Sequence, residues 1–549
     1  MHFAVYHSAM NSTANNAVQI TINQHTHALQ LSTLGHNETL LKTLHRLGLQ
    51  GTKEGCGDGD CGACTVAWCA PQKYDFALPA RYLAINSCLV PTAQLAGSAI
   101  LTVEGIAHLG EANSLHPVQQ AMIDCAGSQC GYCTPGFVMS LFCDYHADSL
   151  SDLSVEGNLC RCTGYTSIRL AIEKLKLQRA NPIPRHPREG GDPGKVSDVL
   201  RRSTHLNLNL QGEFERSTNL GFRLRGNDGN ADGNTVAPKN PVNDATLLIN
   251  DNRPRHPRED GDPGSLNSLF LPTNLSDAFA LKQIHPDALW LAGGTDLGLA
   301  FSQSGGAAQH IALDRISELQ RLEFSDHALH IGGTVPLAGL LALLKTHRSF
   351  EPITRMLHWF AAQQVRNRAT IGGNLGTASP IGDLLPVLLA LDAQIVLARP
   401  TGERTVAAAD YFLSYRQTAC NPDELVLRVE IPKLKPGRIS QSYKIGKRGS
   451  DDISIVSSCF QLGVDAAGRV NFARLAYGGV AAVPMRALAA ESALLSVSAS
   501  DDLLAIAKPI LLSTFQPLSD FRGSAAYRQQ LIVNLFDKFL RQHLANIHG

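Results

Sequence analysis

Cysteine is the residue type with the most chemical potential in this chain of 549 residues, and its thirteen copies are unevenly distributed. Eleven lie before Thr163, and eight of these form two groups whose spacings suit metal binding. The groups are Cys56, Cys61, Cys64 and Cys88, and Cys130, Cys133, Cys160 and Cys162. Disulfide frameworks are typical of small secreted domains, whereas this chain is long and residues 1–16 lack the apolar core of a signal peptide. The cysteines therefore predict metal centres.

The first group has the spacing C-x4-C-x2-C followed by a fourth cysteine. This is the plant-type ferredoxin spacing, in which four thiolates hold one 2Fe–2S cluster. A loop that wraps closely around a cluster needs unusual backbone angles, which Gly55, Gly57, Gly59 and Gly62 can adopt. A zinc site would instead favour paired C-x2-C knuckles. The first group thus predicts an iron–sulfur centre.

The second group joins a C-x2-C pair to a C-x-C pair. Alone, the first pair could be a thioredoxin-like redox motif, but that motif belongs beside a βαβ unit, and here it precedes a helical pattern. Both pairs lie at predicted helix starts, where the positive end of the helix dipole favours anionic thiolates. A second metal centre is therefore predicted. The remaining cysteines are interpreted as buried small thiols, namely Cys69, Cys125, Cys143, Cys420 and Cys459.

Two Gly-Gly turns lie in the second half of the chain. One follows the apolar run 289–292 and the other lies within 370–374. Such loops let backbone N–H groups approach a diphosphate, although most Gly-Gly turns are only tight connections. The chain has no G-x-G-x-x-G on a strand-to-helix turn, so a Rossmann dinucleotide site is not supported.

Periodicity predicts the elements that position these residues. Residues 18–22 alternate like a strand, turn at Asn23-Gln24 and continue at 28–31. Thr39 or Asn37 can cap a helix whose apolar positions Leu40, Leu41, Leu44 and Leu47 share one face. Residues 65–68 predict another strand, which makes the first ninety residues a small α+β unit. Helical periods run from 117 to 178, a mixed α/β pattern starts at 269, and a last helix is predicted over 525–543.

Residues 181–264 have no sustained apolar period and read as a linker. The decapeptide RHPREGGDPG at 185–194 recurs as RHPREDGDPG at 255–264. One repeat pair is too few for a solenoid, so we expect a disordered connector created by a repetitive insertion.

Composition excludes several partner classes. Lys and Arg total 48 and are balanced by 48 Asp and Glu, which argues against nucleic acid or an anionic membrane surface. No apolar run reaches the roughly 18 residues that cross a bilayer. A cytoplasmic protein is expected.

Three segments then show a specific resemblance. EGCGDGDCGACT at 54–65, QCGYCTPGF at 129–137 and NLCRCTGY at 158–165 resemble, in that order, the two-cluster domain of the xanthine dehydrogenase/molybdenum hydroxylase family. The resemblance implies a β-grasp ferredoxin-like domain and a four-helix-bundle domain, each holding one 2Fe–2S cluster on the eight cysteines named above. It also implies that the second cluster is nearest the molybdenum cofactor and the first is nearer a flavin.

The segments AGGTDL and TIGGNLGTASPIGDLLP resemble the FAD domain of the same family, of the vanillyl-alcohol-oxidase type. The resemblance assigns FAD contacts to Leu289, Trp290, Leu291, Ala292, Gly293, Gly294, Thr295, Asp296, Phe360, Thr370, Ile371, Gly372, Gly373, Asn374, Thr377, Asp383, Val426 and Lys444. Residues 447–453 align with the family loop where NAD+ docks beside the flavin, although their sequence departs from the animal pattern. A C-terminal α/β flavoprotein domain follows.

These expectations define a multidomain α+β protein with domains at 17–92, 93–179, 266–436 and 437–549, and the linker at 180–265. No span is left for a molybdopterin domain, so the resemblance implies an iron–sulfur and FAD small subunit. Its partner would be a molybdenum-cofactor large subunit, in a dimer of heterodimers. Electrons from xanthine or hypoxanthine hydroxylation there would pass through both clusters to FAD and NAD+. The open alternatives are a related enzyme acting on an aldehyde or N-heterocycle, a zinc-binding regulatory protein, and a copy disabled by its insertion.

Overall fold

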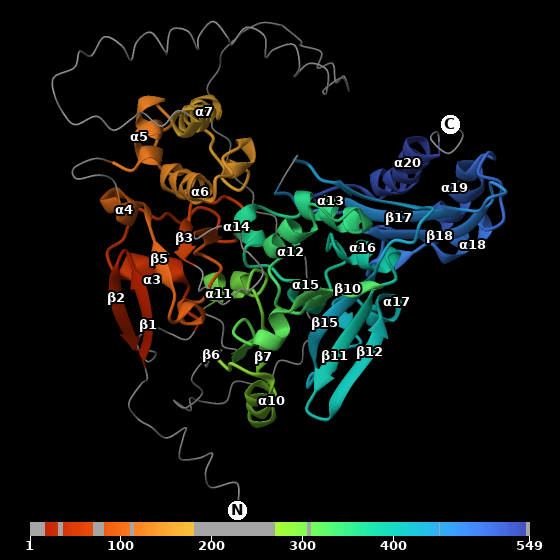
Figure 1. Cartoon of the computed structure of the whole chain (residues 1–549), viewed down its shortest axis with the longest axis horizontal. Helices are drawn as coiled ribbons and strands as arrows, with labels where there is room; N and C mark the ends of the chain where they lie inside the picture. The colour runs from red at the N-terminus through yellow and green to blue at the C-terminus, as the bar shows by residue number, and fades with distance from the viewer. Residues whose placement is uncertain are drawn as a thin grey trace, which may run out of the picture. The chain divides into compact units, whose positions relative to one another are not determined.

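The computed structural model describes residues 17–30, 37–69, 82–109, 115–180, 269–304, 309–448 and 451–544 (Figure 1). The predicted linker lies outside the described residues, except for Ala180 at the end of a helix.

The N-terminal part is built on a five-stranded mixed sheet of order β2-β1-β5-β3-β4. Its strands are β1 (Ala17–Ile22), β2 (His25–Gln30), β3 (Thr65–Cys69), β4 (Leu83–Asn86) and β5 (Ala99–Leu101). β1 and β2 form the predicted hairpin, turning at Asn23 and Gln24 with φ of 49° and 72°. Helix α3 (Leu40–Arg46) begins at the predicted cap, Thr39. The α+β prediction for this part is confirmed.

The next part is helical, with α4 (Val103–Ile106), α5 (Pro117–Asp124), α6 (Thr134–Ala147) and α7 (Thr166–Ala180). α4 is a single turn, whereas α5, α6 and α7 pack their apolar faces into one core. The predicted faces are buried at Val118, Met122, Leu141, Phe142 and Ile172. The helical prediction is confirmed, while its assignment as a four-helix bundle stays a prediction.

The third part contains two sheets. A three-stranded parallel sheet of order β6-β8-β7 comprises β6 (Leu269–Phe270), β7 (Leu289–Leu291) and β8 (His310–Ala312), with helices α10 (Leu275–Ile284) and α11 (Gly298–Ser304). An antiparallel sheet of order β12-β11-β15-β10-β9 comprises β9 (Leu322–Phe324), β10 (Ala328–Gly332), β11 (Gln394–Arg399), β12 (Gly402–Ala407) and β15 (Leu425–Pro432). β15 alternates buried and half-buried residues, as a strand with one face on a core does.

Helices cover this antiparallel sheet and enclose the largest core of the described residues. They are α12 (Leu337–Leu344), α13 (Glu351–Trp359), α14 (Gln363–Arg366), α15 (Ile371–Thr377), α16 (Leu385–Ala390) and α17 (Ala408–Tyr411). A small hairpin of β13 (Phe412–Ser414) and β14 (Gln417–Thr418) follows α17. Below, the residues from 269 to 432 are called the flavin half.

The C-terminal part is a four-stranded antiparallel sheet of β16 (Arg438–Ile445), β17 (Val456–Val464), β18 (Val470–Gly478) and β19 (Met485–Arg486). It packs with α18 (Leu488–Leu494), α19 (Leu503–Thr514) and α20 (Ala525–His543). α20 has the predicted bounds and buries its predicted face, including Phe536 and Phe539. No helix among the described segments is long and apolar enough to span a bilayer. The multidomain α+β class is thus confirmed, and the β-grasp and vanillyl-alcohol-oxidase assignments stay predictions.

Candidate functional site

The first cysteine group lies in the loop between α3 and β3 and just after β4. Cys56 and Cys61 each donate a backbone N–H to the other's sulfur, at 3.3 and 3.2 Å. The sulfurs of Cys64 and Cys88 are 3.3 Å apart, and both residues are buried. That separation is well beyond the 2.05 Å of a disulfide. The four thiols therefore form two pairs within one loop region.

Glycine allows the turns of this loop. Gly59 and Gly62 adopt φ of 86° and 66°, which favour residues without a Cβ. A Cβ on Gly62 would also lie 2.0 Å from the carbonyl oxygen of Gly157. The structure thus bears out the need for glycine inferred from the sequence.

The second cysteine group also forms two pairs. The sulfurs of Cys162 and Cys130 are 3.4 Å apart, and Cys160 hydrogen-bonds Cys133, which is the N-cap of α6. The hydroxyl of Thr163 lies 3.2 Å from the Cys160 sulfur. This group has no buried cysteine, since Cys130 and Cys162 are exposed and the other two are half-buried, whereas the first group has two buried cysteines and one exposed, Cys56.

The thiols in a pair have opposite pKa shifts. The hydrogen bond from Cys56 lowers the pKa of Cys61 to about 6, and the bond from Cys88 lowers the pKa of the Cys64 thiol. Burial, followed by the bond to Cys160, raises the pKa of Cys133 to about 12. In each pair one sulfur thus has a lowered pKa, which favours the thiolate, the form that binds metal.

This arrangement fits a binuclear cluster. Each centre has two thiol pairs, which matches a 2Fe–2S cluster on four cysteines, with two thiolates for each iron.

The two cysteine loops touch. The backbone N–H of Leu159 donates to the carbonyl oxygen of Cys61 at 3.0 Å, and the Asn158 side-chain amide donates to the Gly62 carbonyl at 3.0 Å. Leu159 precedes Cys160 in the chain. The bond from Leu159 to Cys61 therefore joins the backbone at a predicted ligand of the first cluster to the backbone next to a predicted ligand of the second.

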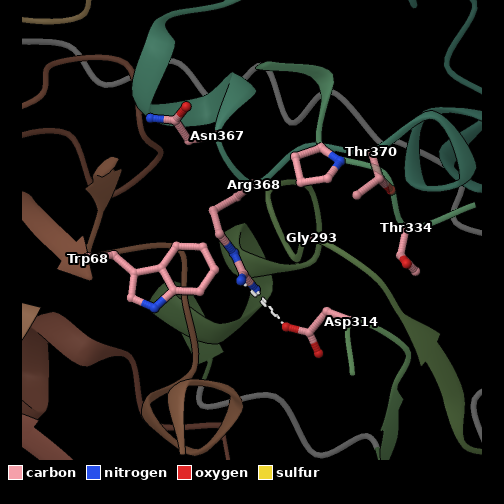
Figure 2. Close-up of a pocket in the computed structure, with 8 residues that line it drawn as sticks. Trp68, Gly293, Asp314, Thr334, Asn367, Arg368 and Thr370 are labelled. Atoms are coloured by element: carbon pink, nitrogen blue, oxygen red, sulfur yellow. Dashed lines mark hydrogen bonds and ion pairs between the residues drawn. The ribbon is translucent and has the colours of Figure 1, made fainter. Parts of the chain in front are cut away.

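The two Gly-Gly turns predicted to hold FAD also come together. Figure 2 shows Gly293 and Thr370 lining one small pocket with Thr334, Asp314 and other residues. A Cβ on Gly293 would lie 1.8 Å from the carbonyl oxygen of Arg368, so the first turn contacts the backbone just before the second loop. The cavity of about 10 Å³ has room for one water and not for a dinucleotide. It marks where the loops meet.

A third Gly-Gly turn, missed from the sequence, supports the second. Gly333 follows β10, and its carbonyl oxygen accepts the N–H of Gly372 at 3.0 Å. A Cβ on Gly333 would lie 2.1 Å from the carbonyl oxygen of Val426. Gly332-Gly333-Thr334, at the end of β10, has the same sequence as Gly-Gly-Thr at 293–295 after β7. This repetition could have identified the third turn from the sequence.

Three of the predicted FAD contacts lie around a buried ion pair. The Lys444 ammonium donates to a carboxylate oxygen of Asp383 and to the carbonyl of Trp359, both at 2.8 Å. The Lys444 and Asp383 side chains are 7% and 9% exposed. Phe360, next in the chain after Trp359, packs against the large core. The hydroxyl of Ser454, which the sequence did not single out, donates to the other Asp383 oxygen.

Other predicted FAD residues differ in their accessibility. The side-chain oxygen of Asn374 is buried and has no hydrogen-bond partner in the part of the chain that the structure describes, so it can accept from a ligand. Thr377 ends α15. Leu289 and Asp296 are exposed, and the Trp290 ring packs edge-on against Phe279. Leu291 is fully buried, so β7 contributes mainly backbone here.

Comparison with known proteins identifies the domains. Residues 102–173 match the "[2Fe-2S] binding domain" family, 265–434 the "FAD binding domain in molybdopterin dehydrogenase" family, and 441–543 the "CO dehydrogenase flavoprotein C-terminal domain" family. Xanthine dehydrogenase 1 of Arabidopsis thaliana is 31% identical over 91% of this chain and 38% of its own length. Xanthine dehydrogenase of Oryza sativa subsp. japonica is 32% identical over 93% of this chain and 39% of its own.

The chain therefore spans less than two fifths of the length of these curated relatives. Among solved structures, a carbon monoxide dehydrogenase from Hydrogenophaga pseudoflava is 27% identical with a TM-score of 0.46. The match covers 49% of this chain and 93% of that one.

Proposed function

The chain carries the 2Fe–2S-binding and flavoprotein domains of the molybdenum hydroxylase family, and we propose that it relays electrons between a molybdenum site on another chain and a soluble acceptor. The observation that carries the proposal is the set of four thiol pairs in two touching loops. Cys56, Cys61, Cys64 and Cys88 would hold the first cluster, and Cys130, Cys133, Cys160 and Cys162 the second.

FAD would lie along the Gly-Gly loops and the Asp383–Lys444 pair. With two iron–sulfur clusters bound, FAD supplies a junction that takes electrons singly and releases them in pairs as hydride. The chain's own residues would hold it. The loops at 289–296 and 370–374 would hold the diphosphate on backbone groups, and Asn374 would offer a buried acceptor. Lys444 and Asp383 would fix a charged and a polar contact at the flavin, and Phe360 would pack against it.

The acceptor side of the proposal rests on residues 447–453. Arg448, in this segment, pairs with Asp60 of the first cysteine loop at 2.7 Å. The Asp452 carboxylate accepts the N–H of Lys447 and that of Arg448. The segment has two basic residues, Lys447 and Arg448, and two acidic ones, Asp451 and Asp452. Because it resembles the family loop where NAD+ docks beside the flavin, we propose NAD+ as the acceptor.

The partner would be a molybdenum-cofactor large subunit that hydroxylates xanthine or hypoxanthine, in a cytoplasmic dimer of heterodimers. The relatives named xanthine dehydrogenase, which extend well beyond the matched span, support this substrate. An aldehyde or another N-heterocycle is the alternative. Assaying the co-purified complex on purines and on aldehydes separates the two.

Cofactor analysis of the full chain tests the core of the proposal. Two clusters predict about four irons and two distinct reduced signals in electron paramagnetic resonance (EPR) spectra, together with flavin absorption. A colourless protein containing zinc, or one with a single reduced species, would contradict it.

A further inference from the structure

One short segment of the flavin half contacts both cysteine loops. This segment consists of α14 and Asn367, and Gln364 within it is buried, at 2% exposed. The Gln364 side-chain nitrogen lies 3.0 Å from the Ser140 hydroxyl and 3.2 Å from the side-chain oxygen of Asn158. It is also 3.4 Å from the hydroxyl of Thr65. One amide thus reaches side chains from three separate segments.

The partners of Gln364 adjoin the predicted cluster ligands. Thr65 directly follows Cys64, and Asn158 lies two residues before Cys160. Ser140 also donates to Asn158 at 2.7 Å, and Asn158 in turn holds the Gly62 carbonyl. Moving Gln364 would therefore disturb the contact between the two loops.

The packing leaves little room for such movement. A Cβ on Gly157 would lie 2.2 Å from the Gln364 side-chain oxygen and 2.5 Å from the Ala362 Cβ. The same glycine's carbonyl excludes a Cβ on Gly62. Three segments thus meet at van der Waals contact, with glycine where two of them approach closest.

Arg366 extends this junction toward the flavin. Its guanidinium forms an ion pair with Glu156, which lies four residues before Cys160, and both side chains are at most 10% exposed. It also donates to the carbonyl oxygen of Phe360 at 2.9 Å and to that of Ala361, which adopts a positive φ of 42°. The planar guanidinium of Arg366 therefore joins the second cysteine loop to the backbone of Phe360, the residue predicted to pack against the flavin.

We propose that Gln364 and Arg366 are positioning residues that set the distances between the two clusters and the flavin. Neither side chain would touch a cofactor. They act by holding the loops at 157–160 and 61–65 against residues 360–362, so that the three centres keep a fixed spacing. This inference rests on the proposed function, because it assumes that the loops carry clusters.

The test compares full-length holoprotein with the Gln364→Glu, Gln364→Asn and Arg366→Met variants. Glutamate keeps the shape of glutamine but replaces the donor that faces the Asn158 oxygen with a second acceptor. Asparagine keeps the amide but shortens its reach. Gln530→Glu is the matched control, because Gln530 is exposed on α20 and its amide donates to Asn534 of the same helix.

Two readouts report distance. The first is the dipolar coupling between the two reduced clusters in EPR spectra, and the second is the rate of electron exchange between flavin and clusters after flash reduction. We expect Gln364→Glu and Arg366→Met to weaken the coupling and to slow exchange by about tenfold to a hundredfold. Iron and FAD contents and the signals of the separate clusters should stay unchanged. The coupling and the exchange rate of Gln364→Asn should lie between those of the wild type and of Gln364→Glu. Both values for Gln530→Glu should match the wild type.

Folded, fully loaded Gln364→Glu or Arg366→Met protein with wild-type coupling and exchange rate would overturn the inference. If Gln364→Glu does not fold, Gln364→Asn and Arg366→Met decide in the same way. A wild-type chain that binds neither iron nor FAD would instead overturn the proposed function, so the two failures are distinguishable.

Discussion

The two cysteine centres share a pairing geometry and differ in burial. At the first centre Cys64 and Cys88 are buried in a small core with Leu41 and Leu89, whereas at the second Cys130 and Cys162 are exposed. Exposed apolar side chains such as Ile123 and Tyr132 lie close in sequence to the second pair. One thiol pair of the first centre, Cys64 and Cys88, is therefore part of the chain's own core, whereas no cysteine of the second centre is fully buried.

Serine substitutions would test this contrast most strongly. Cys64→Ser should remove the first cluster and lower the thermal midpoint, because that cluster would be bound within a core and its binding free energy stabilises the fold. Cys162→Ser should remove the second cluster with a smaller loss of stability. Each variant should fall from about four irons to about two, as measured by iron analysis and calorimetry. Equal losses of stability would contradict the contrast.

The buried ion pair between Asp383 of the flavin half and Lys444 of β16 predicts the next largest effect. Lys444→Met would leave the Asp383 carboxylate without its partner in a site where both side chains are at most 9% exposed. Breaking such a pair costs about 3–5 kcal/mol, and we expect FAD to be lost as well. Urea unfolding and flavin content measure the two effects. Arg541→Met, which breaks an exposed pair on α20, is the control and should change neither.

A buried histidine gives the helical part a pH dependence. Burial, with a smaller contribution from His146, lowers the pKa of His116 to about 4, and the two ring nitrogens are 3.2 Å apart. An unfolded histidine titrates near 6.5. Between these values the unfolded chain binds a proton that the folded chain does not, so stability present above pH 6.5 is lost as pH falls toward 4.

We therefore expect acid to release the second cluster more readily than the first. The measurement is the urea midpoint for loss of each EPR signal at pH 7, 6 and 5. His116→Asn should flatten the profile of the second cluster, because asparagine can still cap α5 without titrating. If the pH profile of the second cluster in His116→Asn matched that of the wild type, the loss of this cluster in acid would come from its thiol ligands and not from His116.

The sequence predicted local structure and the cysteine groups well, because both depend on short-range patterns. The alternation at 18–22, the cap at Thr39 and the bounds of α20 are confirmed. Gln364, Asn158 and Ser454 were missed. Their significance depends on partners up to 299 residues away, and no periodicity encodes such contacts.

The predicted FAD residues show a different limit. The apolar run at 289–291 correctly predicts β7, yet Trp290 packs against α10 and Leu289 faces solvent. A resemblance to a motif predicts which residues lie along a strand. It does not predict where each side chain points, because that depends on the surrounding helices, which are not part of the motif.

The smallest expected effect concerns a second ion pair between a cysteine loop and the segment beside the flavin. Arg448 and Asp60 are 39% and 45% exposed, in contrast to the enclosed Arg366 and Glu156. An exposed pair contributes roughly 0–1 kcal/mol and is screened by salt. Arg448→Met should therefore keep both clusters, FAD and the dipolar coupling, and change flavin–cluster exchange by less than about fivefold. If Arg448→Met instead slowed exchange as much as Arg366→Met, an exposed ion pair would hold the cofactors in place as well as an enclosed one. The spacing of the cofactors would then depend on charge at both loops and not on burial.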